Sequence, residues 1–250
     1  MFIDLFNRLS ITLSITLPIL LIEELETHHK KQKDQNYLLR LMEFDEVIEM
    51  ADFMSEMEVY QDIIPLWTDD HSNYIGLQVQ GACKYRINYI DHEETDVSPG
   101  FRSVRSFIAE LEQHPSFYWD ELKKDYPSDI EISHAEMEED LRCIDELNKL
   151  LSSNPLIDDD IRCQYIFSIM ALTPKRNLDS LIKYLDDEDM YVQERACEIL
   201  GFHRYLPARD KLIEVSTNGM HNGKLAAKRA LARIREENQG AFYWSQDIKK

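Results

Sequence analysis

Two short acidic segments of the chain each place a histidine beside carboxylates. Asp69-Asp70-His71 and Asp91-His92-Glu93-Glu94 both fall in turn-rich stretches next to apolar runs. In the second segment, the carboxylates beside His92 could act as a general acid and base or hold a metal ion. No nucleophile, second ligand cluster or phosphate-binding loop accompanies them, and a charge run on an acidic chain is usually a solvated turn. We therefore expect no catalytic residue, no cofactor and no metal site.

Two other segments resemble ligand sites and have plainer interpretations. His28 and His29 are neighbours, and neighbours on a helix point about 100° apart, so their rings do not converge on one ion. We expect a solvated loop or helix end there. Asp158-Asp159-Asp160 lacks the alternating ligands, central glycine and terminal glutamate of an EF-hand. Acidic residues at a helix N-terminus are a sufficient explanation.

The charge balance restricts the class of partner. With 47 acidic and 28 basic residues, the formal net charge is -19. Such a chain repels phosphate backbones and anionic membrane surfaces and attracts basic proteins. We expect a basic protein partner, no nucleic acid and no membrane; the sequence assigns no oligomeric state.

The cysteines and the N-terminal region favour a cytoplasmic location. Cys83, Cys143, Cys163 and Cys197 form no C-x-x-C pair, which favours buried free thiols in a reducing compartment. The apolar run from Ser10 to Ile22 lacks a cleavage site of the signal-peptide kind and is too short to span a bilayer.

The stretch from Ile63 to Asp91 must position the acidic segments. Its β-branched and aromatic alternation predicts strands over Ile63–Trp67, Tyr74–Val79 and Lys84–Tyr89, the last with one wet face. In an antiparallel meander the ends of adjacent strands lie side by side. We therefore expect the acidic segments to form a partner-binding rim there, with Trp67 or Tyr74 as its anchor. The equal alternative is that Trp67 belongs to the core and the acids only aid solubility. The candidate residues are Trp67, Asp69, Asp70, His71, Tyr74, Asp91, His92, Glu93 and Glu94.

The same stretch carries a resemblance to a known family. Ile-Pro-Leu-Trp-x-Asp-Asp-x-x-x-Asn-Tyr, a strand ending in Ile-Asp-His-Glu, and Ser103-Val-Arg-Ser-Phe-Ile-Ala-Glu-Leu together resemble the SUKH superfamily. Its members are fungal cell-wall-synthesis regulators and bacterial immunity proteins that bind and neutralise secreted toxins. The resemblance implies an antiparallel sheet with flanking helices. Where the family usually has glycine between the acidic turn and the following aromatic residue, this chain has Ser72-Asn73, and asparagine tolerates a left-handed backbone.

Further elements of the first half follow from apolar spacing and caps. We expect a short helix over Phe2–Leu9, an extended segment over Ser10–Leu17, a helix from Pro18 and a strand over Asn36–Met42. Asp45 is expected to cap a helix that runs toward Met57, and Ser103 to cap another that ends at His114-Pro115.

The second half is predicted to be entirely helical. Ser133-His134-Ala135-Glu136 is a capping box that opens a helix. In the helices that follow, corresponding apolar positions recur at intervals of about 31 to 34 residues, at Ile161, Val192 and Leu225. This pattern resembles HEAT-like repeats, with a plain helical bundle as the alternative. The predicted organisation is a SUKH-like α+β domain over residues 1–114, a linker over 115–132 and a HEAT-like helical domain over 133–250.

The function that these observations favour is protein binding without catalysis. We expect a cytoplasmic immunity protein that binds and neutralises a basic bacterial toxin, such as a nuclease. The alternative is an intracellular scaffold or regulator that binds an endogenous protein. An enzyme is disfavoured because the chain contains no G-x-S-x-G, H-E-x-x-H, G-x-x-x-x-G-K or dinucleotide-binding glycines. A toxin gene directly upstream would separate the first two.

Overall fold

The computed structural model describes residues 16–93, 95–130, 132–154 and 156–247, with side chains up to Arg235. The expected helix over Phe2–Leu9 and most of the extended segment Ser10–Leu17 lie outside these residues. The contacts divide the chain into two units, Met1–Tyr126 with Leu156–Gln164, and Pro127–Pro155 with Tyr165–Lys250. The first unit thus includes a segment from later in the chain, where the Gln164 side chain accepts the Val97 N–H at 2.9 Å. The division into 1–114, 115–132 and 133–250 stays a prediction.

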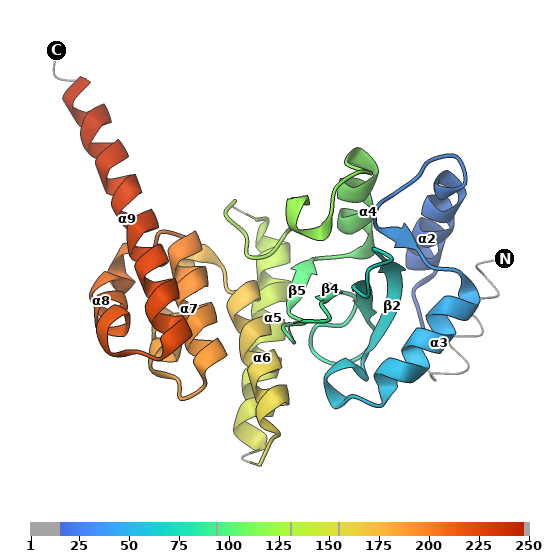
Figure 1. Ribbon diagram of the computed structural model, residues 1–250, viewed down its shortest axis with the longest axis horizontal. Helices are drawn as coiled ribbons and strands as arrows, with labels where there is room; N and C mark the ends of the chain where they lie inside the picture. Colours follow the sequence, from blue (N-terminus) through green and yellow to red (C-terminus); the bar gives the residue numbers. More distant parts are fainter. Residues whose placement is uncertain (1–15, 94, 131, 155, 248–250) are drawn as a thin grey trace. The chain divides into compact units, whose positions relative to one another are not determined.

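A five-stranded antiparallel sheet forms the centre of the first unit, with strand order β1-β2-β3-β4-β5 (Figure 1). Its strands are β1 (Arg40–Leu41), β2 (Ile63–Thr68), β3 (Tyr74–Gln78), β4 (Ile87–Ile90) and β5 (Pro99–Phe101). The predicted antiparallel meander is therefore confirmed. The third predicted strand begins later than expected, because Tyr85 takes a positive φ of 69° in the turn before β4.

In the described residues of the first unit that precede Tyr126, three α-helices and two short 3-10 helices surround this sheet. They are α2 (Ile19–Gln32), α3 (Phe44–Ser55), η1 (Glu58–Tyr60), α4 (Val104–Gln113) and η2 (Trp119–Glu121). Ser103 caps α4 as predicted, since its side chain accepts the Ser106 N–H at 3.1 Å. The predicted helix toward Met57 is present as α3, but its predicted cap is wrong: Glu43 precedes the helix and donates its N–H to Glu46 at 2.7 Å, while Asp45 lies in the first turn.

An aromatic cluster joins α4 to the sheet. The Phe107 ring meets the Trp67 ring at 4.8 Å and the Phe101 ring at 5.2 Å, both edge to face. The Phe101 ring in turn meets Trp119 at 5.5 Å. Trp67 and Phe107 are 0% exposed, so the cluster lies at the centre of the larger apolar core. Aromatic pairs of this geometry add about 0.5–1.5 kcal/mol each beyond area burial.

The second face of the sheet is also buried, so the wet face predicted for β4 is wrong. Arg86 and Asn88 are 3% and 0% exposed. Asn88 donates to the Val97 carbonyl at 2.5 Å, and Arg86 donates to the Arg102 carbonyl at 2.8 Å. A second apolar cluster covers this face; it consists of Met54, Tyr60, Ile63, Ile90 and Val97.

The histidine pair is not solvated, and this prediction is also wrong. His28 and His29 lie within α2, 0% and 8% exposed, because α2 packs against α4 and the sheet. Burial lowers the pKa of both imidazoles. His28 Nδ1 lies 3.1 Å from Glu112 Oε1 of α4, and Lys31 donates to the other oxygen of Glu112 at 2.5 Å.

The second unit is helical throughout its described residues, and no strand follows β5 in them. Its elements are α5 (His134–Ser153), most of α6 (Asp159–Leu172), η3 (Lys175–Asp186), α7 (Met190–Phe202), η4 (Leu206–Ala208), α8 (Arg209–Asn218) and α9 (His221–Asp247). Ser133 caps α5 as predicted. An α+β fold with a helical second half is thereby confirmed.

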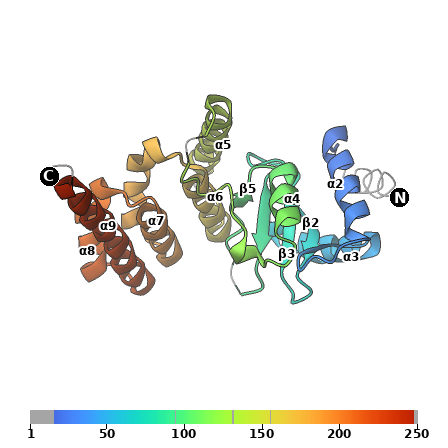
Figure 2. The ribbon, with the colours of Figure 1, turned by 90° about the horizontal axis from the view of Figure 1, so that it is seen from above.

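Successive helices of this unit are tied by one buried glutamine. Gln193 of α7 donates to the Leu185 carbonyl at 2.9 Å, and its oxygen accepts the Met220 N–H at 2.8 Å. The α9 helix lies alongside α7 and α8 in both ribbon views (Figure 2). The prediction missed that the segment over Lys175–Asp186 is 3-10 rather than α-helical.

Phe107→Ala should destabilise the first unit by about 3–5 kcal/mol, because it removes a ring that three other aromatic residues contact. Urea unfolding would measure the change. Phe53→Ala removes a ring that is 60% exposed and should cost far less. Equal losses for both variants would contradict a central role for Phe107.

His203 should make the second unit less stable as the pH falls. Burial, and secondarily the charge of Lys175, lower its pKa from 6.5 to about 4. The unfolded chain therefore takes up a proton below about pH 6.5 while the folded chain does not, so the stabilisation is complete above 6.5 and is lost toward pH 4. Between about pH 7 and about pH 5.5 the wild type should lose about 1 kcal/mol more than His203→Gln. Parallel pH profiles from urea unfolding would contradict this.

Candidate functional site

Antiparallel pairing of β3 with β4 brings the two acidic segments together. Tyr74, the first residue of β3, pairs with Ile90, the last residue of β4. The turn before β3 and the loop after β4 must therefore meet at the same end of these two strands. We call the carboxylates gathered there the acidic rim, and they belong to Glu46, Asp69, Asp70, Asp91 and Glu93.

Asp69 organises the turn between β2 and β3. One of its oxygens accepts the N–H groups of His71 and Asn73, at 2.7 and 3.2 Å, and the other accepts the Asn73 amide at 2.7 Å. The left-handed positions in this turn are Asp70 and Ser72, with φ of 60° and 72°, and not Asn73. Asn73 serves the turn through its side chain instead.

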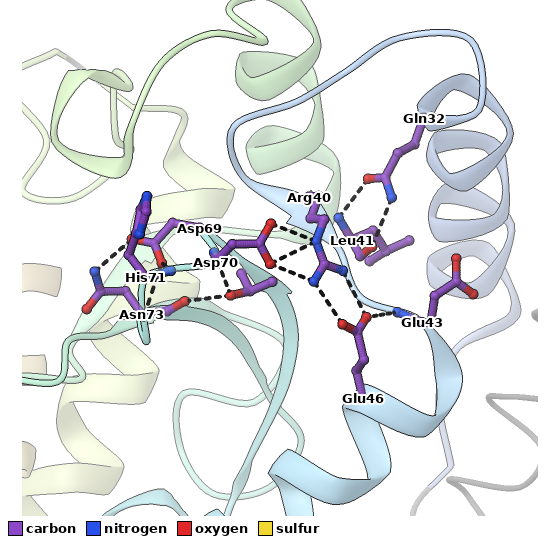
Figure 3. A network of polar contacts seen from close by, with 10 residues as sticks. Gln32, Arg40, Leu41, Glu43, Glu46, Asp69, Asp70, His71 and Asn73 are labelled. Atoms are coloured by element: carbon purple, nitrogen blue, oxygen red, sulfur yellow. Dashed lines mark hydrogen bonds and ion pairs between the residues drawn. The ribbon is translucent and has the colours of Figure 1, made fainter.

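Arg40 of β1 connects this turn to α3 (Figure 3). Its guanidinium donates to both oxygens of Glu46 at 2.8 Å and to both oxygens of Asp70 at 2.6 to 3.0 Å. These hydrogen bonds, first to Glu46 and then to Asp70, raise the pKa of Arg40, and the same contact lowers the pKa of Glu46. Two of the rim carboxylates are thus occupied by one cation.

The loop after β4 attaches to the turn through Asn73. The Asn73 side-chain oxygen lies 3.2 Å from the His92 backbone nitrogen and 2.8 Å from His92 Nδ1, which donates in the tautomer that this contact favours. Asp91 accepts the Glu93 N–H at 2.7 Å. The Glu93 side chain is 80% exposed, and its Oε1 lies 3.8 Å from Nε2 of the His92 ring. Asp91 and Glu93 therefore offer charge that no arginine of the rim neutralises.

The two aromatic candidates have different places. Trp67 is 0% exposed and contacts Phe107 and His28, so it belongs to the core and cannot serve as the surface anchor. Tyr74 is half-buried at the rim. Burial raises its pKa, and the charges of Asp69, Asp70 and Glu46 add to that while Arg40 opposes it. His71 and His92 are exposed, and Glu94 lies outside the described residues.

The described residues contain no group of three or more histidine, cysteine, aspartate or glutamate side chains placed to hold a metal ion. In the same residues, no helix is both long enough and apolar enough to cross a membrane. What the rim can do chemically is present oriented carboxylates and a half-buried tyrosine to a partner.

Sequence reasoning missed Arg40 and Glu46. Arg40 lies in a stretch predicted as a strand, and Glu46 follows the residue that was taken for a helix cap. Their role depends on the pairing of Arg40 with Thr68, which places the guanidinium beside the acidic turn. An arginine inside a predicted strand was the available signal.

Comparison of the chain with protein-family models, with curated proteins and with solved structures finds no match in any of the three.

Asn73→Ala should destabilise the first unit by about 2 kcal/mol, because it removes the hydrogen bonds that the Asn73 side chain makes with Asp69 and His92. Hydrogen exchange at the His92 amide should quicken in the variant. His71→Ala is the matched control, since its N–H bond to Asp69 comes from the backbone and survives the substitution. Unchanged exchange at His92 would show that Asn73 does not hold the loop.

Proposed function

We propose that this chain is a non-enzymatic, cytoplasmic immunity protein that binds and neutralises a basic bacterial toxin through the acidic rim. The observation that carries the proposal is the rim itself. Two loops separated in sequence converge there, and they are held by hydrogen bonds among Asp69, Asn73 and His92. The resemblance of this stretch to SUKH immunity proteins supplies the toxin as the class of partner.

The rim suits a basic partner on electrostatic grounds. It sits on a chain of formal charge -19, so the long-range field and the local carboxylates have the same sign. Such a surface steers a cationic protein toward itself and speeds association, an effect that salt screens. Because the turn is already fixed by internal hydrogen bonds, binding would cost little additional ordering of the backbone.

The internal bonds also decide which carboxylates are available. Asp69 accepts hydrogen bonds within the turn, and Asp70 accepts them from Arg40. Replacing either residue would therefore disturb the structure as well as the charge. Asp91 and Glu93 are the carboxylates whose charge can be removed while the shape is kept. The helical second unit supports protein binding separately, because stacked helix pairs present extended surfaces that commonly bind proteins.

Asp91→Asn combined with Glu93→Gln should slow association with a basic toxin domain about tenfold at low salt and flatten the salt dependence. The thermal midpoint should stay near that of the wild type, because the amide that replaces the Asp91 carboxylate keeps an oxygen that can accept the backbone N–H of residue 93. Stopped-flow mixing would measure the rates with a panel of basic nuclease toxin domains, including any encoded directly upstream. Survival of bacteria that co-express each toxin would report neutralisation.

The matched control is Asp145→Asn with Glu146→Gln, which removes the same two charges from exposed positions of α5. It should associate at nearly the wild-type rate. Equal rates for all three proteins would exclude the rim as the interface. A wild-type chain that protects against no toxin of the panel and instead captures a protein of its own cell would support the scaffold alternative and contradict immunity.

A further inference from the structure

A hollow of about 250 Å³ lies in the second unit between α7 and α9. The two helices pack closely here, because a Cβ on Gly201 would lie 2.7 Å from the backbone of Ala230. The floor of the hollow is apolar, formed by Ile199 of α7 with Ala226 and Ala230 of α9, all of which are buried.

Three arginines surround this floor. Arg195 comes from α7, and Arg229 and Arg233 come from successive turns of α9. Glu198 also lines the hollow; it lies 3.7 Å from Arg195 and offsets part of its charge, so two arginine charges exceed the one carboxylate. Arg229 and Arg233 are exposed, and within the side chains that the structure describes no carboxylate pairs with either of them. The hollow is therefore cationic although the whole chain is strongly acidic.

This arrangement is unfavourable for the helix by itself. From His221 to Arg235 the chain contains five lysines and arginines, and the first acids of α9 are Glu236 and Glu237. Arg229 and Arg233 are like charges at i, i+4, a spacing that destabilises an isolated helix by about 0.2–0.5 kcal/mol. A bound anion would relieve the repulsion between Arg229 and Arg233.

The size and lining of the hollow indicate which kind of anion it would bind. Its volume is below the roughly 300–1,000 Å³ of sites for drug-sized ligands, so it suits one charged group on a short stem. Paired guanidinium forks match the oxygens of phosphate, and the apolar floor beside Phe202 suits a ring. A polynucleotide is disfavoured because its remaining phosphates would meet a chain with 47 carboxylates.

We propose that the hollow between α7 and α9 binds a phosphate monoester carried on a small apolar or aromatic group, with Arg229 and Arg233 holding the phosphate. The ester can belong to a small molecule or to a phosphorylated side chain of another protein. This site is independent of the acidic rim and of the proposed toxin binding.

Isothermal titration calorimetry of the full chain with phenyl phosphate at about pH 7.5, where the ester is mostly a dianion, tests the proposal. Arg229→Gln with Arg233→Gln should weaken binding about tenfold or more. Lys228→Gln with Arg235→Gln removes the same charge from exposed positions of α9 that do not line the hollow, and should weaken it less than about threefold. Arg229→Lys with Arg233→Lys keeps the charge, loses the forks and should fall between the two.

Titrations with other ligands identify what the hollow binds. A short peptide with one phosphotyrosine that binds more tightly than phenyl phosphate, and depends on the same arginines, would assign the site to a phosphorylated protein. Arginine-dependent binding of phenyl phosphate but not of the peptide would assign it to a small molecule. Inorganic phosphate or benzoate binding as tightly as phenyl phosphate, equal losses in both glutamine double variants, or no binding by the wild type would each overturn the proposal.

Discussion

The contact between the Phe107 and Trp67 rings is the interaction on which the first unit depends. It joins α4 to β2, and through Phe101 and Trp119 it reaches β5 and η2. Residues far apart in sequence thereby meet at one point, and each ring is buried only if the others are in place. Because a slip of one residue would turn every side chain of a strand to the opposite face, this cluster also selects the register of the sheet. The acidic rim follows from that register.

Burial of both faces of the sheet explains where the charges of the first unit lie. Strands covered on two sides have little room for unpaired polar side chains, and Asn88 is accommodated by a hydrogen bond to a nearby carbonyl. The carboxylates gather instead at the ends of strands, where water is accessible. Within the rim they divide into two kinds: Glu46, Asp69 and Asp70 hold the structure, while Asp91 and Glu93 keep their charge available. A surface of this kind is rigid as well as charged, which favours fast and specific association.

The two units offer ligands opposite electrostatic environments. The rim presents carboxylates and attracts cations, whereas the hollow between α7 and α9 presents arginines. The net charge of the chain acts in the same direction as the rim and against the hollow. Only an anion that is compact enough to contact the arginines closely would gain more from them than it loses to the surrounding carboxylates.

The sequence by itself determined the features that depend on neighbouring residues. Strand alternation on both sides of Asp69–Asn73 predicted the hairpin, and the serines at 103 and 133 predicted two helix starts, because turns and caps are satisfied within a few residues. Antiparallel topology then implied that the two acidic segments share an edge. Tertiary structure alone decided which of the predicted polar and aromatic residues are exposed. Trp67 and His28 are buried, and Arg40 joins the rim, because a helix or a strand from elsewhere in the chain packs against each of them. Local periodicity shows that a residue has a face, but burial depends on what covers that face, and the covering elements are brought there by long-range packing.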